Sequence, residues 1–281
     1  MTEDDGALTQ SLPAFSVITI SFHDLDGLKR TVNSVRAQRY SGRIEHIVID
    51  GGSGQHVVDY LSRYNSGFKH WQSRPDGGRY DAMNQGIKHA SGDLLWFMNS
   101  GDCFSDPDAI AQVAKAVSGC PAREIWGYGG ANLIAHDGSH IGRKVPVPFD
   151  LCRFLTRGIT IPHQATFFGS LLVGELGEYD CDFGIIADQL YIFGAALLRE
   201  PIAMPRVLCD FDVTGVGTGR PLRDHFRDMR QICVIHRFYP VRGRWMSLTY
   251  MRCIEYWFRA KEAASLARAF LIAQLDRRIS A

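Results

Sequence analysis

The chain has 281 residues, of which 46% are hydrophobic and 22% are charged, and its formal net charge is +1. This is an ordinary globular composition, long enough for one large α/β domain with an appendage or for two small domains. It excludes a whole-chain bias toward nucleic acid, and no apolar run approaches the roughly 20 residues that span a bilayer. Seven scattered cysteines without a CxxC pair argue against a disulfide framework or a zinc site and favour a reducing cytoplasm. Residues 1–14 are acidic and polar, so we expect a flexible tail there and not a secretory signal.

The first third of the chain alternates apolar runs with amphipathic segments. Short β-rich apolar runs that end in polar turns predict strands, and apolar residues at three- or four-residue spacing predict helices. In chain order the pattern predicts strands at 15–22, 44–49, 68–72 and 94–98, and helices at 28–38, 57–64 and 80–90. This alternation with short turns predicts a mostly parallel sheet with helices on both faces.

The second half of the chain is less regular. Helices are predicted at 106–117, 151–157, 167–176 and 187–198, and strands at 125–133 and 207–213. Residues 135–139 (AHDGS) have the chemistry of a hairpin turn. Residues 215–219 form a glycine-rich loop, which is either a mobile segment with Arg220 beside it or a plain linker.

The composition changes near residue 220. Residues 221–281 carry 12 Lys/Arg against 5 Asp/Glu, a net charge of +7, and their pattern predicts basic helices with interleaved aromatic side chains. One interpretation is contact with an anionic membrane surface, and the other is packing on the rest of the chain or on a second subunit of a homo-oligomer. No recognised motif favours nucleic acid. We therefore expect domains at 15–220 and 221–281.

Three of the predicted strands or turns end in an aspartate followed or preceded by glycine. Asp50 precedes Gly51 and Gly52, Asp76 precedes two further glycines, and Asp102 follows the strand at 94–98. Because the carboxyl ends of parallel strands meet at one edge of a sheet, these residues are expected to line a common cleft. A divalent cation that bridges a diphosphate needs only one or two protein carboxylates, which makes Asp102 a candidate metal ligand. The alternative for each aspartate is a structural turn residue.

Three motifs appear in this order: Asp50-Gly51-Gly52-Ser53, the stretch YDAMNQGI at 80–87, and Asn99-Ser100-Gly101-Asp102. In order and spacing they resemble the family-2 glycosyltransferases, in particular the branch that acts in capsular polysaccharide, exopolysaccharide and glycolipid assembly. The resemblance covers roughly residues 15–220, and YDAMNQGI is its most specific part. It implies a GT-A fold, a Rossmann-like sheet that binds a nucleotide-diphospho-sugar donor through Mn²⁺ or Mg²⁺.

The resemblance also implies roles for residues of the nucleotide half. It places Ser21 and His23 at the nucleotide, Asp50 on the base, and Asp76 with Arg79 in the nucleotide-sugar pocket. The family often has Thr and Asn where this chain has Ser21 and His23, so recognition of the base departs from the family pattern.

Asp102 takes the position of the last acid in the DxD-type metal motif of the family. That motif here reads Asn-Ser-Gly-Asp, which leaves one acid and shifts more of the metal coordination to the diphosphate.

Inverting transfer needs a general base that deprotonates the acceptor hydroxyl. In the family this carboxylate opens a helix after the metal motif, and the matching segment, Ile186-Ala187-Asp188-Gln189-Leu190, nominates Asp188. The alternative is an ordinary helix cap. The segment at 161–165 resembles one on the acceptor side, and it nominates His163 as a contact for phosphate or acceptor.

These observations predict an inverting, metal-dependent glycosyltransferase that moves one sugar to a glycan or lipid-linked acceptor. We expect it in the cytoplasm, with contact to the inner face of the membrane through the basic helices. One alternative is a sugar-phosphate nucleotidyltransferase, which the stretch SFHDLDG at 21–27 disfavours because it lacks a glycine-rich basic loop. Another is a nucleotide-sugar-binding subunit without catalytic activity, which the single acid of the metal motif keeps open.

Overall fold

The computed structural model describes residues 12–135, 137–145, 148–215 and 220–279, with side chains up to residue 268. It divides into two compact units. The first unit takes in the chain up to Phe149 and from Ile161 to Val216, and the second takes in Asp150–Thr160 and the chain from Gly217 onward.

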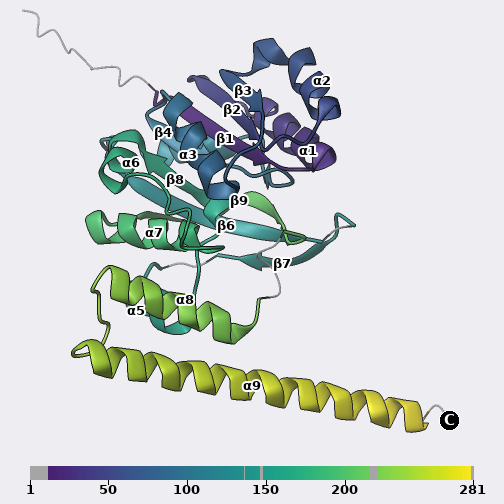
Figure 1. The fold of residues 1–281 in the computed structure, drawn as a ribbon, viewed down its shortest axis with the longest axis vertical. Helices are drawn as coiled ribbons and strands as arrows, with labels where there is room; N and C mark the ends of the chain where they lie inside the picture. The colour runs from purple at the N-terminus through teal and green to yellow at the C-terminus, as the bar shows by residue number, and fades with distance from the viewer. Residues whose placement is uncertain (1–11, 136, 146–147, 216–219, 280–281) are drawn as a thin grey trace, which may run out of the picture. The chain divides into compact units, whose positions relative to one another are not determined.

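The first unit is built around one curled sheet (Figure 1). Its strands are β1 (Phe15–Ser21), β2 (Ile44–Asp50), β3 (His70–Ser73), β4 (Leu94–Phe97), β5 (Cys103–Phe104), β6 (Trp126–Ile134), β7 (His140–Lys144), β8 (Thr166–Gly169) and β9 (Ile202–Asp212). They lie in the order β3-β2-β1-β4-β8-β6-β9-β5, with β7 paired to β6. Strands β3, β2, β1 and β4 are parallel, as the sequence pattern predicts. Strand β8 is antiparallel to both β4 and β6.

Helices cover both faces of this sheet. Those of the first unit are α1 (Leu25–Arg36), α2 (Gln55–Arg63), α3 (Arg79–His89), α4 (Ala109–Ala116), α6 (Ser170–Leu176) and α7 (Ala187–Leu198). Residues alternate between faces along β1, because successive side chains of a strand point to opposite sides. Val17 belongs to the core that also holds Val35 of α1 and Ile110 of α4. Ile18 faces Gly86 of α3, where an added Cβ would meet the Ile18 methyl group.

Local chemistry explains where the helices begin. The Asp24 side chain accepts a hydrogen bond from the backbone N–H of Gly27 and so caps α1, whose buried side is Leu28, Val32 and Val35. Helices α2 and α3 each begin after a glycine with positive φ, Gly54 and Gly78, a backbone conformation that other residues rarely adopt.

The second half of this unit departs from prediction in two places. One is strand β9, which begins at Ile202 and not at residue 207. We predicted a helix over 167–176, but residues 166–169 form strand β8, and only α6 from Ser170 is helical. All four residues of β8 are buried, and a short apolar run of this kind has no alternation that would distinguish a strand from a helix. The turn at 135–139 does connect an antiparallel pair, β6 and β7, although residue 136 lies outside the described chain.

The second unit is helical, with α5 (Leu151–Arg157), α8 (Leu222–Ile235) and α9 (Arg244–Ile279). Within it, Phe226 of α8 contacts Phe258 of α9, and Arg230 forms an ion pair with the buried carboxylate of Glu255 at 2.6 Å. None of the helices within the described part of the chain has both the length and the apolar composition needed to cross a bilayer.

Candidate functional site

The two Asp-Gly-Gly turns lie against each other at the carboxyl edge of the parallel strands. A Cβ atom added to Gly52, whose φ is +85°, would lie 2.9 Å from the backbone nitrogen of Pro75. A Cβ atom on Gly51 would meet the Phe22 ring and lie 3.1 Å from a carboxylate oxygen of Asp76. Only glycine permits so close an approach, so the two turns and the end of β1 pack together at this edge. The common cleft expected there stays a prediction.

The buried Asp50 carboxylate holds the backbone of the first Asp-Gly-Gly turn in place through hydrogen bonds. It is 0% exposed and accepts hydrogen bonds from the backbone N–H groups of Gly52 and Ser53 and from the hydroxyl groups of Ser53 and Ser73. These partners satisfy a buried carboxylate within the protein, which identifies a loop-shaping function in this structure. Its expected contact with a nucleotide base stays a prediction.

The end of β1 presents an aromatic ring. Phe22 is 65% exposed and its ring centroid lies 4.1 Å from that of His23, a residue held at the left-handed φ of 52°. The backbone N–H of His23 donates to the Ser53 hydroxyl at 2.7 Å, which ties this segment to the Asp50 turn. An exposed ring beside two close-packed turns is a surface on which a flat base can stack.

Two buried polar atoms at this edge have no hydrogen-bonding partner within the described chain. They are Oγ of Ser21, at the end of β1, and Oδ1 of Asn99, just after the neighbouring strand β4. Buried polar groups are nearly always paired, so two orphaned atoms on adjacent strand ends indicate a place where a polar ligand can complete the hydrogen bonding. The predicted role of Ser21 at the nucleotide fits this position.

Asp102 lies deeper in the same edge. Its side chain is 3% exposed, and one carboxylate oxygen accepts from the backbone N–H of Asp212 at 2.9 Å. The Gln164 side chain also hydrogen-bonds to this carboxylate. Burial raises the pKa of Asp102 to about 8, and the nearby charge of Asp212 adds to the rise. An ionised Asp102 is therefore costly in the free protein.

Asp212, at the end of β9, brings a second carboxylate to this region. One of its oxygens pairs with Arg30 of α1 at 3.1 Å, and the other accepts from the backbone N–H and the hydroxyl of Thr214. A Cβ atom on Gly101 would lie 3.2 Å from Asp212, so the Asn-Ser-Gly-Asp turn packs directly on it. The sequence pattern identified this strand but gave no reason to single out Asp212.

Asp102 and Asp212 are a suitable donor set for a hard divalent cation. Mg²⁺ and Mn²⁺ prefer oxygen ligands and need only one or two carboxylates when a diphosphate supplies the others. A cation would also relieve the like-charge contact that raises the pKa of Asp102. In the described residues no group of three His, Cys, Asp or Glu side chains could hold a metal ion by itself.

Asp188 occupies the first turn of α7 and faces a set of hydroxyl-bearing rings. Its Oδ1 lies 3.5 Å from the Tyr80 hydroxyl, which donates to the backbone carbonyl of Ile185 at 2.6 Å. Burial raises the pKa of Tyr80 far above its usual value, and the negative charge of Asp188 contributes to this. Tyr80 lies in the first turn of α3, directly after the Asp76 turn, so this contact joins the strand-end edge of the sheet to the start of α7.

The charge of Asp188 also affects the pKa values of Lys144, in β7, and of His163. Burial lowers the pKa of Lys144 to about 8, and Asp188 opposes that shift. Burial likewise lowers the pKa of His163, again opposed by Asp188. Asp188 therefore sits within the electrostatic reach of an amine, an imidazole and the tyrosine hydroxyl groups.

His163 itself is part of the interior. It is 3% exposed, its ring stacks on Phe97 with centroids 5.1 Å apart, and its Nε2 lies 2.8 Å from the Tyr179 hydroxyl. Tyr179 in turn stacks on Tyr191 of α7. In this structure His163 positions Tyr179 within a buried aromatic cluster, and the contact with phosphate or acceptor expected from the sequence stays a prediction.

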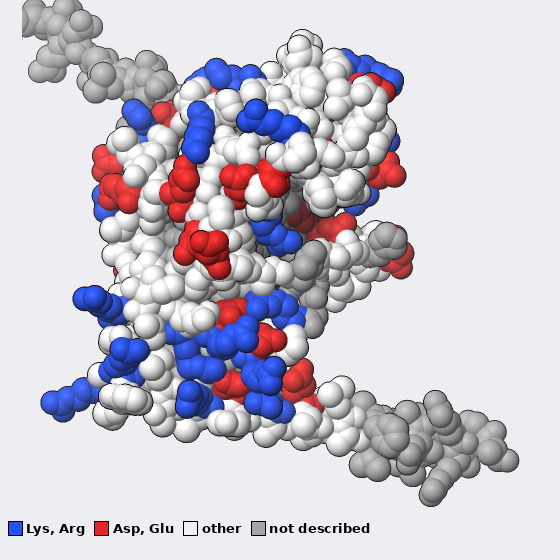
Figure 2. Space-filling model, in the orientation of Figure 1, with Lys and Arg blue, Asp and Glu red and all other residues white. Residues whose placement is uncertain are grey.

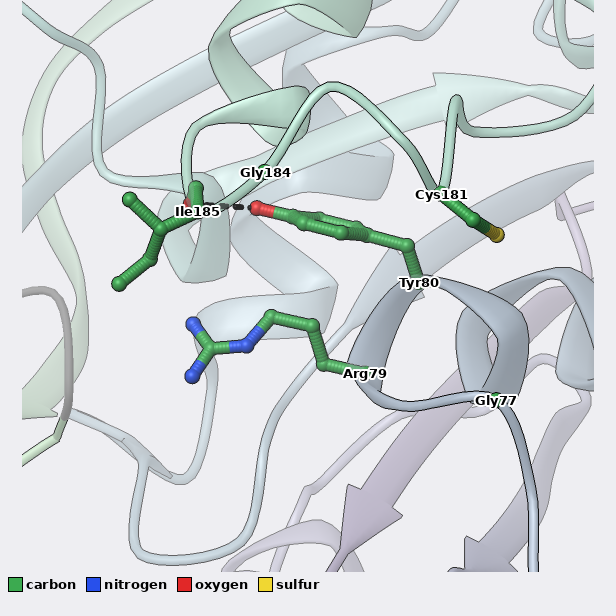
Figure 3. Close-up of a pocket in the computed structure, with 6 residues that line it drawn as sticks. All are labelled: Gly77, Arg79, Tyr80, Cys181, Gly184 and Ile185. Carbon is green, nitrogen blue, oxygen red and sulfur yellow. Dashed lines mark hydrogen bonds between the residues drawn. The ribbon is translucent and has the colours of Figure 1, made fainter.

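A small cavity of about 300 Å³ opens beside this region (Figure 3). Its lining is Gly77, Arg79 and Tyr80 at the start of α3, and Cys181, Gly184 and Ile185 on the facing loop. Figure 3 shows the Arg79 guanidinium beneath the Tyr80 ring, on the same side as Ile185, while the Cys181 sulfur points away. Arg79 thus offers an exposed cation between the Asp76 turn and the loop that precedes Asp188.

The structure thus groups the predicted residues in two adjoining places. Ser21, His23, Asp50 and Asp76 lie together at the strand ends. Arg79 lies beside the Tyr80 ring and faces the loop that precedes Asp188. Sequence reasoning missed Phe22, Tyr80 and Asp212. An apolar residue between Ser21 and His23 was the available signal for Phe22. Residues 216–219 of the glycine loop lie outside the described chain, and Arg220 pairs with Asp228 inside the second unit at 2.6 Å.

Comparison with known proteins places the chain among sugar transferases. The model of glycosyl transferase family 2 matches residues 16–125. An uncharacterized glycosyltransferase of Mycobacterium tuberculosis is 57% identical over 248 residues, which are 88% of this chain and 93% of that protein. A PGL/p-HBAD biosynthesis glycosyltransferase of Mycobacterium bovis is 30% identical over 199 residues, 70% of this chain and 74% of that protein.

Solved structures agree in fold. TarS residues 1–349 of S. aureus, in complex with UDP-GlcNAc, matches with a TM-score of 0.61 and 14% identity over 85% of this chain and 70% of that one. The mannosyltransferase PcManGT of Pyrobaculum calidifontis, in complex with GDP-Man and Mn²⁺, matches with a TM-score of 0.59 and 17% identity over 94% of this chain and 81% of that one. These matches confirm the predicted GT-A fold. By its sequence relatives, the chain belongs to glycosyltransferase family 2.

Proposed function

We propose that the chain transfers one sugar, with inversion, from a nucleotide-diphospho-sugar to a hydroxyl group of a glycan or lipid-linked acceptor. The observation that carries this proposal is the juxtaposition of Asp188 with Tyr80, because it sets a carboxylate beside the helix that follows the Asp76 turn. The relative from Mycobacterium bovis, by its name, acts in glycolipid-type biosynthesis, which supports the choice of acceptor class.

In the proposed arrangement the nucleotide lies at the strand ends. The base stacks on Phe22, and its polar atoms reach Ser21 Oγ and Asn99 Oδ1, which are otherwise unpartnered. Asp50 contributes by fixing the Gly51-Gly52 backbone. Asp76 and His23 lie on either side of the proposed nucleotide position. Arg79 is placed to neutralise phosphate charge. The bound complexes of the two structural neighbours, with UDP-GlcNAc and with GDP-Man, support a nucleotide-sugar as the donor.

In the transfer step one proton moves, one bond forms and one bond breaks. The Asp188 carboxylate takes the proton of the acceptor hydroxyl, whose oxygen bonds to the anomeric carbon as the bond from that carbon to the diphosphate oxygen breaks. Attack opposite the leaving diphosphate inverts the configuration. Tyr80 holds the loop before Asp188 through the Ile185 carbonyl, and this fixes where the base meets the acceptor.

Asp102 and Asp212 would hold the divalent cation together with the diphosphate. Such a cation neutralises the charge that develops on the leaving diphosphate. The Mn²⁺ in the PcManGT complex supports this assignment.

The test is donor hydrolysis with Mn²⁺ over a panel of UDP-, GDP- and dTDP-sugars. Asp102→Ala and Asp188→Ala are each expected to lower turnover by at least about a hundredfold. The matched control is Asp182→Ala, since Asp182 is an exposed aspartate of the same region. If neither Asp102→Ala nor Asp188→Ala changes turnover, the site assignment fails.

A second candidate is a protein that binds nucleotide-sugars without transferring them. The observation that favours it is the internal use of the Asp102 carboxylate by Asp212 and Gln164. Binding of a donor with no hydrolysis and no transfer by the native protein, with Mn²⁺ present, would establish this alternative.

A further inference from the structure

One side of helix α9 is buried by packing inside the second unit. Ser247 and Met251 are 0% exposed and Glu255 is 5% exposed. Residues at this spacing of four lie along one stripe of a helix. The stripe faces α8, as the Phe226–Phe258 contact and the Arg230–Glu255 ion pair show.

The remaining circumference of the first half of α9 carries a second set of large apolar side chains. Their exposed fractions are 84% for Trp245, 57% for Met246, 46% for Tyr250, 65% for Tyr256 and 58% for Trp257. Single exposed apolar residues are normal on a protein surface, but five within three and a half turns of one helix form a patch. Such patches mark contact with another molecule.

The residue types of the patch favour a lipid–water boundary as the occupant. Four of the five side chains are Trp or Tyr, whose rings are part apolar and part polar and concentrate at the headgroup level of bilayers. No described helix can span a bilayer, so α9 would lie along the surface.

The charges around the patch select an anionic surface. Residues 241–268 hold 6 Lys/Arg and 2 Asp/Glu, a net charge of +4, and one of the two acids is the paired Glu255. Cations are held next to the rings, with Lys261 Nζ 5.3 Å from the Trp257 ring centre and the Arg259 guanidinium 5.8 Å from that of Tyr256. Lys and Arg also gather on the face of the second unit that Figure 2 presents.

This charge argues against a second copy of the chain as the occupant. Two copies joined through α9 would set like charges against each other, which weakens association. Anionic phospholipid headgroups are the complementary partner, because each nearby Lys or Arg strengthens attraction to them. We propose that the exposed side of α9 docks on an anionic phospholipid surface, with Trp245 and Trp257 inserted at headgroup level.

The experiment uses the full chain and vesicles of phosphatidylcholine, with and without 30 mol% phosphatidylglycerol, at about 0.1 M salt. Binding is measured by co-sedimentation, and insertion by the quenching of tryptophan fluorescence with brominated phosphatidylcholine. Of the other three tryptophans, Trp96 and Trp126 are 0% exposed and Trp71 is half-buried against the core of the first unit, so quenching will come mainly from Trp245 and Trp257. We expect binding and quenching with anionic vesicles only, and loss of binding as salt is raised.

Two variants separate the contributions of rings and charges. Trp245→Ser with Trp257→Ser is expected to reduce vesicle affinity by at least about tenfold and to abolish quenching. Arg252→Gln with Lys261→Gln should reduce affinity by about fivefold for each charge removed. Leu171→Ser is the control, because Leu171 is an exposed apolar residue (46%) of the first unit. It should leave both readouts unchanged. Thermal melting and donor hydrolysis verify that each variant is folded.

Three results would overturn the proposal. One is a native protein that does not sediment with anionic vesicles, or that binds neutral vesicles equally well. Another is unchanged vesicle binding by the double tryptophan variant. The third is a native dimer in analytical ultracentrifugation that the tryptophan substitutions convert to a monomer, which would assign the patch to a second copy.

Discussion

Asp102→Asn is predicted to change how the stability of the protein depends on pH. Burial, with the charge of Asp212 in support, raises the pKa of Asp102 from its ordinary value of 3.8 to about 8 in the folded chain. The native state therefore holds a proton that the unfolded state releases, and stability falls as pH rises from about 4 to about 8. The asparagine variant lacks this titration, so its stability should be flatter over the same range.

The magnitude follows from the size of the shift. Each pKa unit corresponds to about 1.4 kcal/mol, so the penalty for Asp102 reaches an upper bound of about 4 kcal/mol at pH 7 but only about 2 kcal/mol at pH 5. The difference in unfolding free energy between Asp102→Asn and the native protein should thus grow in favour of the variant by roughly 2–3 kcal/mol between these two pH values. A constant offset from altered hydrogen bonds to Asp212 and Gln164 does not affect this comparison.

The measurement is urea unfolding in EDTA-containing buffers from pH 5 to pH 8, followed by near-ultraviolet circular dichroism. Asp182→Asn controls for the loss of one surface charge, since Asp182 is exposed. Parallel pH profiles for Asp102→Asn and the native protein would refute the reasoning, because they would mean that Asp102 is ionised in the native state without a penalty.

Three further substitutions, the last with a comparison variant, test individual contacts. Tyr80→Phe removes the hydroxyl that holds the loop before Asp188, and it should lower turnover on the order of tenfold while leaving donor affinity unchanged in a titration; a large loss of donor affinity would contradict a positioning role. Asp50→Ala removes the acceptor of four hydrogen bonds, two of them from the buried Ser53, and should cost on the order of 3 kcal/mol in urea unfolding. A cost below about 1 kcal/mol would show that the loop does not depend on this carboxylate. Gly86→Ala should lower the free energy of unfolding by about 1–3 kcal/mol, because its Cβ would overlap a β-branched core side chain of β1. Gly174→Ala, which has open space around it, should raise the free energy of unfolding by about 0.5–1 kcal/mol. Equal effects of the two variants would rule out the packing argument.

The regular part of the fold could be predicted because its signals are local. Strands β1, β2 and β4 are β-rich, largely apolar runs that lead into polar or glycine-containing turns, and each lies within two residues of its expected bounds. Strand β8 could not be recognised, since its four residues owe their extended backbone to pairing with β4 and β6, which lie far away in sequence. Pairing of this kind leaves no periodic trace in so short a run.

The candidate site was predictable where a motif marks it and not where tertiary packing makes it. The two Asp-Gly-Gly turns can be recognised in the sequence by their glycines. The close approach of Gly52 to Pro75 follows from the parallel register of β2 and β3. Asp212 meets Asp102 only because β9 runs beside β6 and β5, a pairing that no spacing encodes. Likewise, the burial of His163 depends on aromatic rings contributed by several elements.

The most direct test of the proposed function is the effect of Asp188→Asn on binding and on turnover, measured on the same preparation. Donor affinity is measured by calorimetry with the preferred nucleotide-sugar, and turnover by release of the nucleoside diphosphate. We predict that donor affinity stays within about twofold while turnover falls by about 10²- to 10⁴-fold, because the substitution removes a proton acceptor without a change of shape. Native turnover in the folded Asp188→Asn variant would contradict the assignment of this carboxylate as the base for sugar transfer.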